Sequence, residues 1–310
     1  MNEILRYTSA TIMAVLALTG IIVNTYVFRA LTKQKSHLSV FYKLCISKTI
    51  CNLITCAAFA AWSAPCTFIE FYYLPYWANV FWGQIAGWGA YITGICIQVC
   101  LSLNRFTVTY FPLSSNQHHK VFNIGNCLIL LTIIFLLSTV YGFPGGCGYI
   151  YSIEIVSWLP EDSECALNHA DQIFYFIITV AFVSNSSNLA TFLKLLKATR
   201  SNTVTIFQGS RTKKSRLMFA QSVTQDCLHV VDMLACQVIY KFNDALWFQF
   251  ICMSVVWLAI HVFDGFVMML YNRDIHPAFL KRCSARKSIK ATAQSNGGGA
   301  SNTAVTSKVF

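Results

Sequence analysis

Residues Leu246–Asn272 read LWFQFICMSVVWLAIHVFDGFVMMLYN, and Asp264 is the one residue among them that carries a charge at neutral pH. A helix needs about 20 predominantly apolar residues to cross the hydrocarbon core of a bilayer, and this run is long enough. Comparable runs recur along the 310-residue chain. We therefore expect seven transmembrane helices, which cover residues 7–31, 40–64, 82–103, 121–143, 173–195, 217–240 and 246–272.

The composition excludes most soluble classes of protein. Hydrophobic residues make up 55% of the chain and charged residues only 11%, whereas average soluble domains carry about 25% charged residues. The 24 Phe, 14 Tyr and 7 Trp are too many for a disordered chain. The composition therefore predicts an all-α integral membrane protein built mostly of spanning helices.

Lysine and arginine indicate how the chain is oriented in the membrane. If the N-terminus lies outside, the cytoplasmic segments hold all but three of the 23 basic residues, and most acidic residues fall outside. This is the distribution that the positive-inside rule describes. We therefore expect an outer N-terminus and a cytoplasmic C-terminus. The net charge of +11 then faces anionic lipid and cytoplasmic partners, not nucleic acid.

Several polar residues lie inside the expected spans. Polar side chains are costly in hydrocarbon, so we expect Asn24, Asn52 and Asp264 to face the bundle interior and pair with one another. The alternative is that each one only holds two helices together. Lys48 is expected to extend toward the inner headgroups, with pairing to Asp264 as the alternative. Asp226 lies near the inner end of its span, where it can meet Arg105.

The order of these motifs resembles that of rhodopsin-like G-protein-coupled receptors. The matching stretches are Asn24, Asn52 in place of the usual Asp, Asn104-Arg105-Phe106, Phe111-Pro112-Leu113 and Asp264-Gly265-Phe266-Val267-Met268. The resemblance implies a receptor domain over residues 1–283 that ends in a short helix 8. Residues 284–310 are polar and rich in small residues, and we expect a disordered cytoplasmic tail there.

A closer resemblance is to the nematode chemoreceptors called serpentine receptor class x. The residues that carry it are Ser47-Lys48-x-x-x-Asn52, Leu103-Asn104-Arg105-Phe106, Phe111-Pro112, Cys147-Gly148-Tyr149, Gln221-Ser222-x-x-Gln225-Asp226 and Asp264-Gly265. This resemblance implies a chemosensory receptor, not an enzyme, in the plasma membrane or the sensory cilium of a neuron. It would convert binding of an extracellular small molecule into activation of a heterotrimeric G protein. The alternative function is a membrane transporter or a ligand-gated channel.

The resemblance also implies roles for individual residues. It assigns G-protein coupling to four residues: Asn104, Arg105, Phe106 and Pro112. It assigns an interior polar network, at which a sodium ion could bind near the carboxylate, to Asn24, Asn52, Asp264 and Asn272. The chain departs from the family pattern because an Asn, not an acid, precedes Arg105, so the usual inner lock between that pair cannot form.

A ligand pocket is expected between the outer halves of spans three, five and seven. These halves offer Trp88, Tyr91, Ile92, Ile95, Phe174 and Trp247. Such a wall suits a small apolar ligand. The alternative is that the tryptophans belong to the aromatic belt at the membrane surface.

Three of the 13 cysteines lie near the oxidising outer side: Cys66, Cys147 and Cys165. The family usually ties its third span to the second outer loop, but no cysteine stands near Val80 to do so. We expect a Cys147–Cys165 disulfide within the loop, with Cys66–Cys165 as the rival pairing. Cys283 follows the expected helix 8 among basic residues and is a candidate for palmitoylation.

Overall fold

The structure is a computed structural model that describes residues 2–33, 40–111, 124–143, 145–200, 206–272 and 275–276, without the side chains of 198–200 and 206–216. The chain up to Asn272 forms one compact unit. The expectations for helix 8, Pro112, Cys283 and the tail 284–310 lie outside the described residues.

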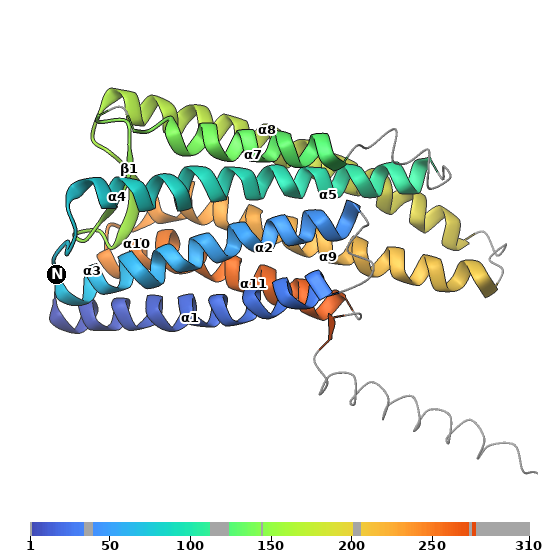
Figure 1. The fold of residues 1–310 in the computed structure, drawn as a ribbon, viewed down its shortest axis with the longest axis horizontal. Coiled ribbons are helices and arrows are strands. Elements are labelled where there is room, and N and C mark those ends of the chain that lie inside the picture. Colours follow the sequence, from blue (N-terminus) through green and yellow to red (C-terminus); the bar gives the residue numbers. More distant parts are fainter. Residues whose placement is uncertain are drawn as a thin grey trace, which may run out of the picture. The chain divides into compact units, whose positions relative to one another are not determined.

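Seven helical segments make up this unit (Figure 1). The first is α1 (Glu3–Lys33), and the second joins α2 (Val40–Ala58), η2 (Phe59–Ser63) and α3 (Ala64–Ile69). The third joins α4 (Tyr76–Gly83), η3 (Gln84–Tyr91) and α5 (Ile92–Tyr110). The fourth, fifth and sixth are α7 (Ile124–Val140), α8 (Glu164–Arg200) and α9 (Ile206–Gln237), and the last is followed by the 3-10 turn η4 (Ile239–Phe242). The seventh joins α10 (Leu246–Phe250), η5 (Ile251–Val255) and α11 (Val256–Tyr271).

Five of the seven segments are, by length and composition, apolar enough to cross a membrane within the described residues. They are Glu3–Lys33, Val40–Ile69, Tyr76–Tyr110, Glu164–Lys197 and Leu246–Tyr271. The described part of α7 is apolar but shorter. Helix α9 is long but holds Asp226, His229 and Asp232, which lower its hydropathy. These three side chains make polar contacts with neighbouring helices, so a polar sequence still fits inside the bundle.

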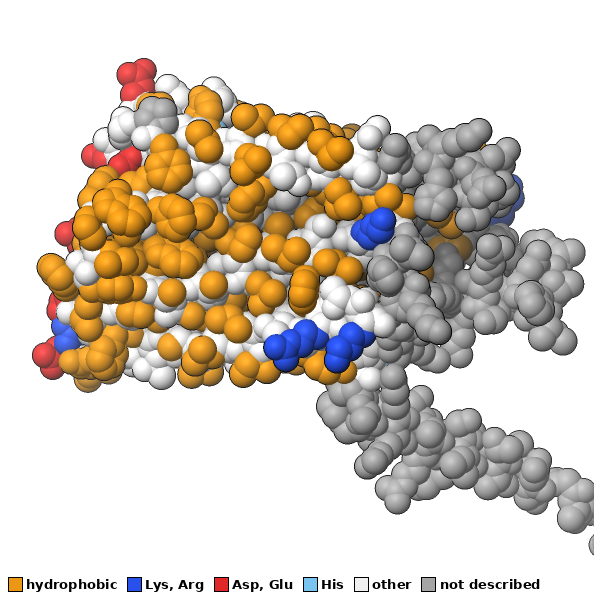
Figure 2. All heavy atoms as spheres, viewed as in Figure 1, with side chains coloured by type: hydrophobic (Ala, Val, Ile, Leu, Met, Phe, Trp, Pro, Cys, Tyr) orange, Lys and Arg blue, Asp and Glu red, His pale blue; other side chains and the backbone are white. Residues whose placement is uncertain are grey.

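Helix α5 lies at the centre of the bundle and packs against α2, α7, α8 and α9, while α1 packs against α2 and α11. The outer faces of the helices carry large apolar side chains, seen in orange in Figure 2. Ile22, Leu137 and Phe182 are each more than 65% exposed. Contiguous apolar surface of this extent marks a face that contacts lipid or another partner, and it fits a bundle surrounded by lipid.

A two-stranded hairpin, which the sequence analysis missed, covers one end of the bundle. Strand β1 (Tyr149–Ser152) pairs antiparallel with β2 (Ser157–Pro160), and Tyr151 lies opposite Trp158. A hairpin of this size is marginal on its own. Its stability comes from packing, because the side chains of Tyr151 and Trp158 are buried in the core between the helices. The prediction of seven helices is confirmed, and the predicted all-α fold contains in addition one short two-stranded sheet.

The bundle therefore has two distinct ends. The hairpin end holds β1, β2 and the first residues of α1, and the opposite end holds the last residues of α1 and α5 (Figure 1). On the face shown in Figure 2, acidic side chains gather at the hairpin end and most basic ones lie toward the opposite end.

Candidate functional site

The three polar residues expected to meet in the interior do meet there. The Asn52 amide nitrogen on α2 donates to Asn24 Oδ1 on α1 and to Asp264 Oδ2 on α11, each at 3.3 Å. All three side chains are fully buried. Gly265 lets α11 come this close to α1, because a Cβ at its position would lie 2.9 Å from Asn24 Oδ1.

The network contains His261, which the sequence analysis did not single out. Its Nδ1–H donates to Asn52 Oδ1 at 2.9 Å, and its backbone carbonyl accepts from the Asn24 amide at 3.1 Å. A lone histidine within an apolar run gives no signal of its partners, so pattern alone could not find it. Asn272, the fourth expected member, lies at the end of α11, two helical turns beyond Asp264.

Lys48 belongs to the same network, and the expectation that it extends toward the headgroups was wrong. Its side chain is fully buried, and its ammonium lies 3.6 Å from Asp264 Oδ2. It donates to the Gly94 carbonyl oxygen at 3.0 Å and contacts His229 Nε2 at 2.7 Å. Three partners, two of them buried and one half-buried, hold the charge inside the bundle, so Lys48 pairs with Asp264, which was the alternative expectation. Removal of one partner from such a pair leaves an uncompensated buried charge.

The residues around Asp264 do not fit a sodium ion. The Lys48 ammonium already supplies one positive charge to this carboxylate, and Asn52 donates to the same oxygen. A second cation would be repelled by the ammonium, with little solvent between them to screen it.

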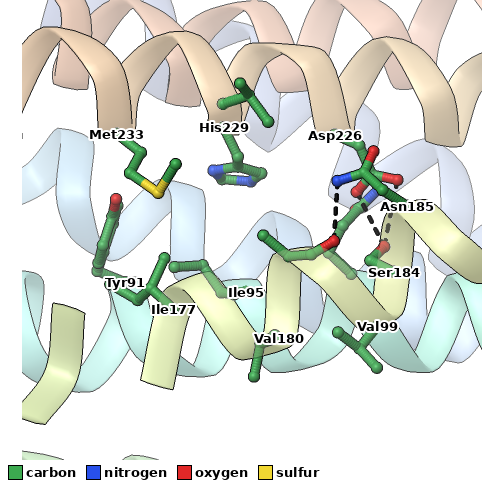
Figure 3. Close-up of a pocket in the computed structure, with 13 residues that line it drawn as sticks. Tyr91, Ile95, Val99, Ile177, Val180, Ser184, Asn185, Asp226, His229 and Met233 are labelled. Carbon is green, nitrogen blue, oxygen red and sulfur yellow. Dashed lines mark hydrogen bonds between the residues drawn. The ribbon is translucent and has the colours of Figure 1, made fainter. Parts of the chain in front are cut away.

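A narrow cavity, partly open to the surroundings, lies between α5, α8 and α9 (Figure 3). Its walls are mostly apolar, with polar groups at one end near Asp226. The residues that line it are Tyr91, Ile95, Gln98, Val99, Ile177, Val180, Ala181, Ser184, Asn185, Asp226, His229, Val230 and Met233. A concave, largely apolar site with a few polar groups is the usual form of a small-molecule site.

Two of the six residues expected at the pocket, Tyr91 and Ile95, line this cavity. Trp88 packs against Tyr149 of the hairpin, with ring centroids 4.6 Å apart, and Trp247 is 51% exposed. Ile92 is buried and Phe174 half-buried, and neither lines the cavity. The hairpin fills the space beside Trp88, so the cavity lies deeper and takes its third wall from α9.

Asp226 joins three helices. Ser184 on α8 donates to its two carboxylate oxygens at 3.2 Å, and the Asn188 amide also donates to it. The Ser184 hydroxyl further contacts the Ser102 hydroxyl on α5 at 2.8 Å. Within the described residues, no ion pair joins Asp226 to Arg105, the meeting expected from the sequence. The carboxylate is instead held by neutral donors.

Arg105 lies near the end of α5 and is only 6% exposed. Its guanidinium lies over the Phe41 ring, 5.1 Å from the centroid. None of its three nitrogens has a hydrogen-bond partner among the residues that the structure describes. Asn104 is half-buried beside it, and Phe106 stacks on Tyr110 with centroids 4.5 Å apart. An unpaired buried charge is costly, so this group is ready to accept a partner.

The hairpin is fastened by a disulfide and by side-chain bonds. Cys147 and Cys165 form the disulfide, with Cα atoms 5.2 Å apart, and Cys66 of the rival pairing is a free, buried thiol. The Asn79 amide donates to the Tyr151 carbonyl oxygen, and Asn79 Oδ1 accepts from the Tyr151 N–H, each at 2.9 Å. The structure therefore has the expected disulfide at the hairpin end.

Comparisons with known proteins agree with this architecture. A search of curated proteins finds no relative of this sequence. Among solved structures, the crystal structure of squid rhodopsin superposes with a TM-score of 0.64 at 12% identity, covering 89% of this chain and 80% of that one. Structural similarity at such low sequence identity is evidence for the fold but not for the function, and it confirms the seven-helix bundle. Residues 15–272 match the family model described as serpentine type 7TM GPCR chemoreceptor Srx, a family of receptors and not of enzymes. The chain belongs to this family: it is a multi-pass membrane protein and a serpentine seven-transmembrane chemoreceptor of the Srx type.

Proposed function

We propose that this chemoreceptor lies in the plasma membrane of a sensory cell, and in its cilium where the cell has one, with the hairpin end outside and the C-terminus in the cytoplasm. A small molecule bound from outside then activates a heterotrimeric G protein at the opposite end. The distribution of charge supports this orientation. Glu154 lies in the hairpin turn, and Glu161 and Asp162 directly follow β2. Lys33 is the last residue of α1, and Lys194 contacts Tyr110 at the end of α5. Basic residues are retained on the cytoplasmic side of membrane proteins.

The observation that carries the proposal is the guanidinium of Arg105, which has no hydrogen-bond partner in the part of the chain that the structure describes. The residue before it is Asn104 and not an acid, no ion pair to Arg105 is found among the described residues, and the Phe41 ring covers it from one side. An arginine has five N–H donors and is always charged. A G-protein segment that presents carbonyl or carboxylate oxygens to Arg105 would satisfy donors that the receptor alone leaves unpaired within its described residues.

The cluster around Asp226 supports a route from ligand to G protein. This carboxylate bonds to Ser184 on α8, and Ser184 contacts Ser102 on α5, only three residues before Arg105. A ligand that favours one packing of α5, α8 and α9 changes the surroundings of the guanidinium at the same time. It can do so only if its affinity differs between the two packings.

Three further parts of the proposal rest on the sequence alone. Phe106 and Pro112 flank the coupling surface, and Cys283 anchors the segment after the seventh helix through a palmitoyl chain. One acyl chain gives weak membrane binding by itself, but the neighbouring basic residues add electrostatic attraction to anionic lipid.

The test is a cell assay with a broad G-protein reporter and a panel of small odorants. Arg105→Ala should abolish the response and leave the amount of receptor at the cell surface unchanged. Arg29→Ala is the matched control, because Arg29 is exposed and lies toward the same end. A normal response from Arg105→Ala would reject the role of Arg105, and a lost response from Arg29→Ala would show that any basic residue at this end matters.

A further inference from the structure

The imidazole of His229 connects the cavity to the interior network. It lines the cavity from α9 (Figure 3), and its Nε2 lies 2.7 Å from the Lys48 ammonium. The Asp264 carboxylate forms an ion pair with the same ammonium, at 3.6 Å. An ammonium can only donate hydrogen bonds. His229 Nε2 must therefore accept, and the ring hydrogen must be on Nδ1.

The Nδ1–H of His229 has no partner among the described residues and is shielded from water. Unpaired buried donors are rare in native proteins, and each one needs a reason. Here the nearby walls are hydrocarbon: Ile95, Ile177, Val180 and Met233. His229, which lines the cavity, thus carries a donor with no partner in the described chain, beside apolar walls.

The other polar groups of the cavity argue against a charged ligand. Both oxygens of the Asp226 carboxylate accept hydrogen bonds from Ser184, and Asn188 donates another. These donors already satisfy the carboxylate, so it does not need a cationic ligand as a partner. The Gln98 amide donates to the Ser222 carbonyl at 3.2 Å, which leaves Gln98 Oε1 without a partner in the described chain. One free donor and one free acceptor suit a neutral oxygen function.

We propose that His229 Nδ1–H is the hydrogen-bond donor that recognises the ligand of this receptor, and that the ligand is a small, neutral molecule with a hydrocarbon body and an acceptor oxygen. Ketones, esters and alcohols belong to this class, and the hydrogen of an alcohol can also be donated to Gln98 Oε1. The inference rests on the proposed function in one respect, that the cavity between α5, α8 and α9 is the receptor's ligand site. The cavity is narrow, so the ligand must spread its walls slightly to reach the imidazole.

The same bond gives the ligand a path into the network. Hydrogen bonds in a chain polarise one another. An acceptor at Nδ1–H therefore makes Nε2 a stronger acceptor for the Lys48 ammonium, which is shared with Asp264 and Gly94. The ligand thus shifts Lys48 toward α9 and weakens its hold on α11.

The inference is tested by binding to the purified full-length receptor in lipid nanodiscs, without G protein. The probes share a seven-carbon body: a methyl ketone, the parent alkane, a primary ammonium and a carboxylate. Binding is read from the rise in unfolding temperature with probe concentration, corrected for partition into the lipid. We expect the ketone to bind about fivefold more tightly than the alkane, the ratio given by a net hydrogen bond of ordinary strength. The two charged probes should bind more weakly than the ketone.

Three variants locate the interaction. His229→Phe should bring the ratio of ketone to alkane affinity to about one, because the donor is gone and the apolar wall stays. Met233→Leu should change both affinities and keep the ratio, since Met233 offers only hydrocarbon and sulfur to the cavity. Ala181→Phe fills the cavity from α8 and leaves the imidazole in place, and it should abolish binding of both probes.

Several results would overturn the inference: a wild-type receptor that binds none of the probes, that does not prefer the ketone, or that binds a charged probe most tightly. A preference that survives in His229→Phe would overturn it as well. If that variant does not fold, the wild-type series and Ala181→Phe still decide the matter. Because no G protein is present, binding as expected without any cellular response would reject the proposed signalling role and leave this inference standing.

Discussion

The hairpin end and the charged interior, which we define as Lys48, Arg105, Asp226 and Asp264, are held together in different ways. The hairpin docks through aromatic packing and neutral hydrogen bonds, with Trp158 1% exposed. The charged interior depends on one ion pair, one carboxylate held by neutral donors, and one guanidinium with no hydrogen-bond partner in the described chain. Functional sites are commonly built from the less satisfied parts of a fold. The difference indicates that the hairpin end is held by uncharged contacts, while the interior holds groups that can change partners.

The bonds at the hairpin end do not depend on pH near neutrality. Burial raises the pKa of the Tyr151 hydroxyl, so this group stays protonated and keeps its 2.5 Å contact with Thr67. The Trp62 indole N–H donates to Asn79 Oδ1 at 2.8 Å, and Asn79 binds the hairpin backbone. A loop held in this way acts as a fixed cover.

The largest expected effect is in the charged interior. Lys48→Met removes the counter-ion of Asp264, and we expect a loss of about 4 kcal/mol in stability, because the remaining carboxylate stays buried without its partner. Thermal unfolding of the purified receptor measures it. The double variant Lys48→Met with Asp264→Asn removes both charges and should recover most of the loss. If the Lys48→Met receptor is as stable as wild type, the Lys48–Asp264 ion pair contributes nothing to the free energy of unfolding.

Gly83→Ala tests the hairpin end. A Cβ at Gly83 would overlap the backbone carbonyl of Tyr149, so the hairpin must move away from α4, at a cost of about 3 kcal/mol. The matched control is Gly145→Ala, because a Cβ there meets nothing within 4 Å. Equal unfolding temperatures for the two variants would contradict the docking of the hairpin described above.

Cys147→Ser should cost a similar or slightly smaller amount, about 2–3 kcal/mol, because the disulfide closes a loop between residues 18 apart. A reducing agent should lower the unfolding temperature of the wild-type receptor to that of the variant. Cys227→Ser serves as control, since Cys227 is an exposed free thiol. If reduction leaves the wild type unchanged, the bond contributes nothing to stability.

The smallest effect on stability and the largest on signalling are expected from one substitution, Arg105→Met. The guanidinium has no hydrogen-bond partner among the described groups, so replacing it with an apolar side chain should change the free energy of unfolding by less than about 1 kcal/mol. The odorant response should nevertheless be lost. A strongly destabilised variant would show that Arg105 is structural, and the contrast between the two regions would fail.

The sequence predicted the parts of this fold that a bilayer dictates. Runs of about 20 apolar residues specify spanning helices, and the cost of polar groups in hydrocarbon correctly predicted that Asn24, Asn52 and Asp264 lie together. The hairpin escaped prediction because strands of four residues have little signal of their own. The strands can dock only because Gly83 and Gly87, in the third helical segment, have no Cβ that would overlap Tyr149.

The partners of Lys48 were harder to predict for a related reason. Its ammonium is held by the Gly94 carbonyl and by His229, which lie on two other helices. No spacing along the chain indicates how these helices are rotated. The position of the cavity was hard to predict for the same reason, since only packing reveals that α9 forms its third wall.

The proposed roles, ligand entry at the hairpin end and G-protein binding at the opposite end, depend on which end faces the cell exterior. A membrane-impermeant thiol reagent applied to intact cells tests this with two single-cysteine additions, Glu154→Cys at the turn of the hairpin and Lys33→Cys at the end of α1, both exposed positions. The account predicts labelling of Glu154→Cys in intact cells and of Lys33→Cys only after permeabilisation. Labelling of Lys33→Cys in intact cells, with Glu154→Cys protected, would contradict it.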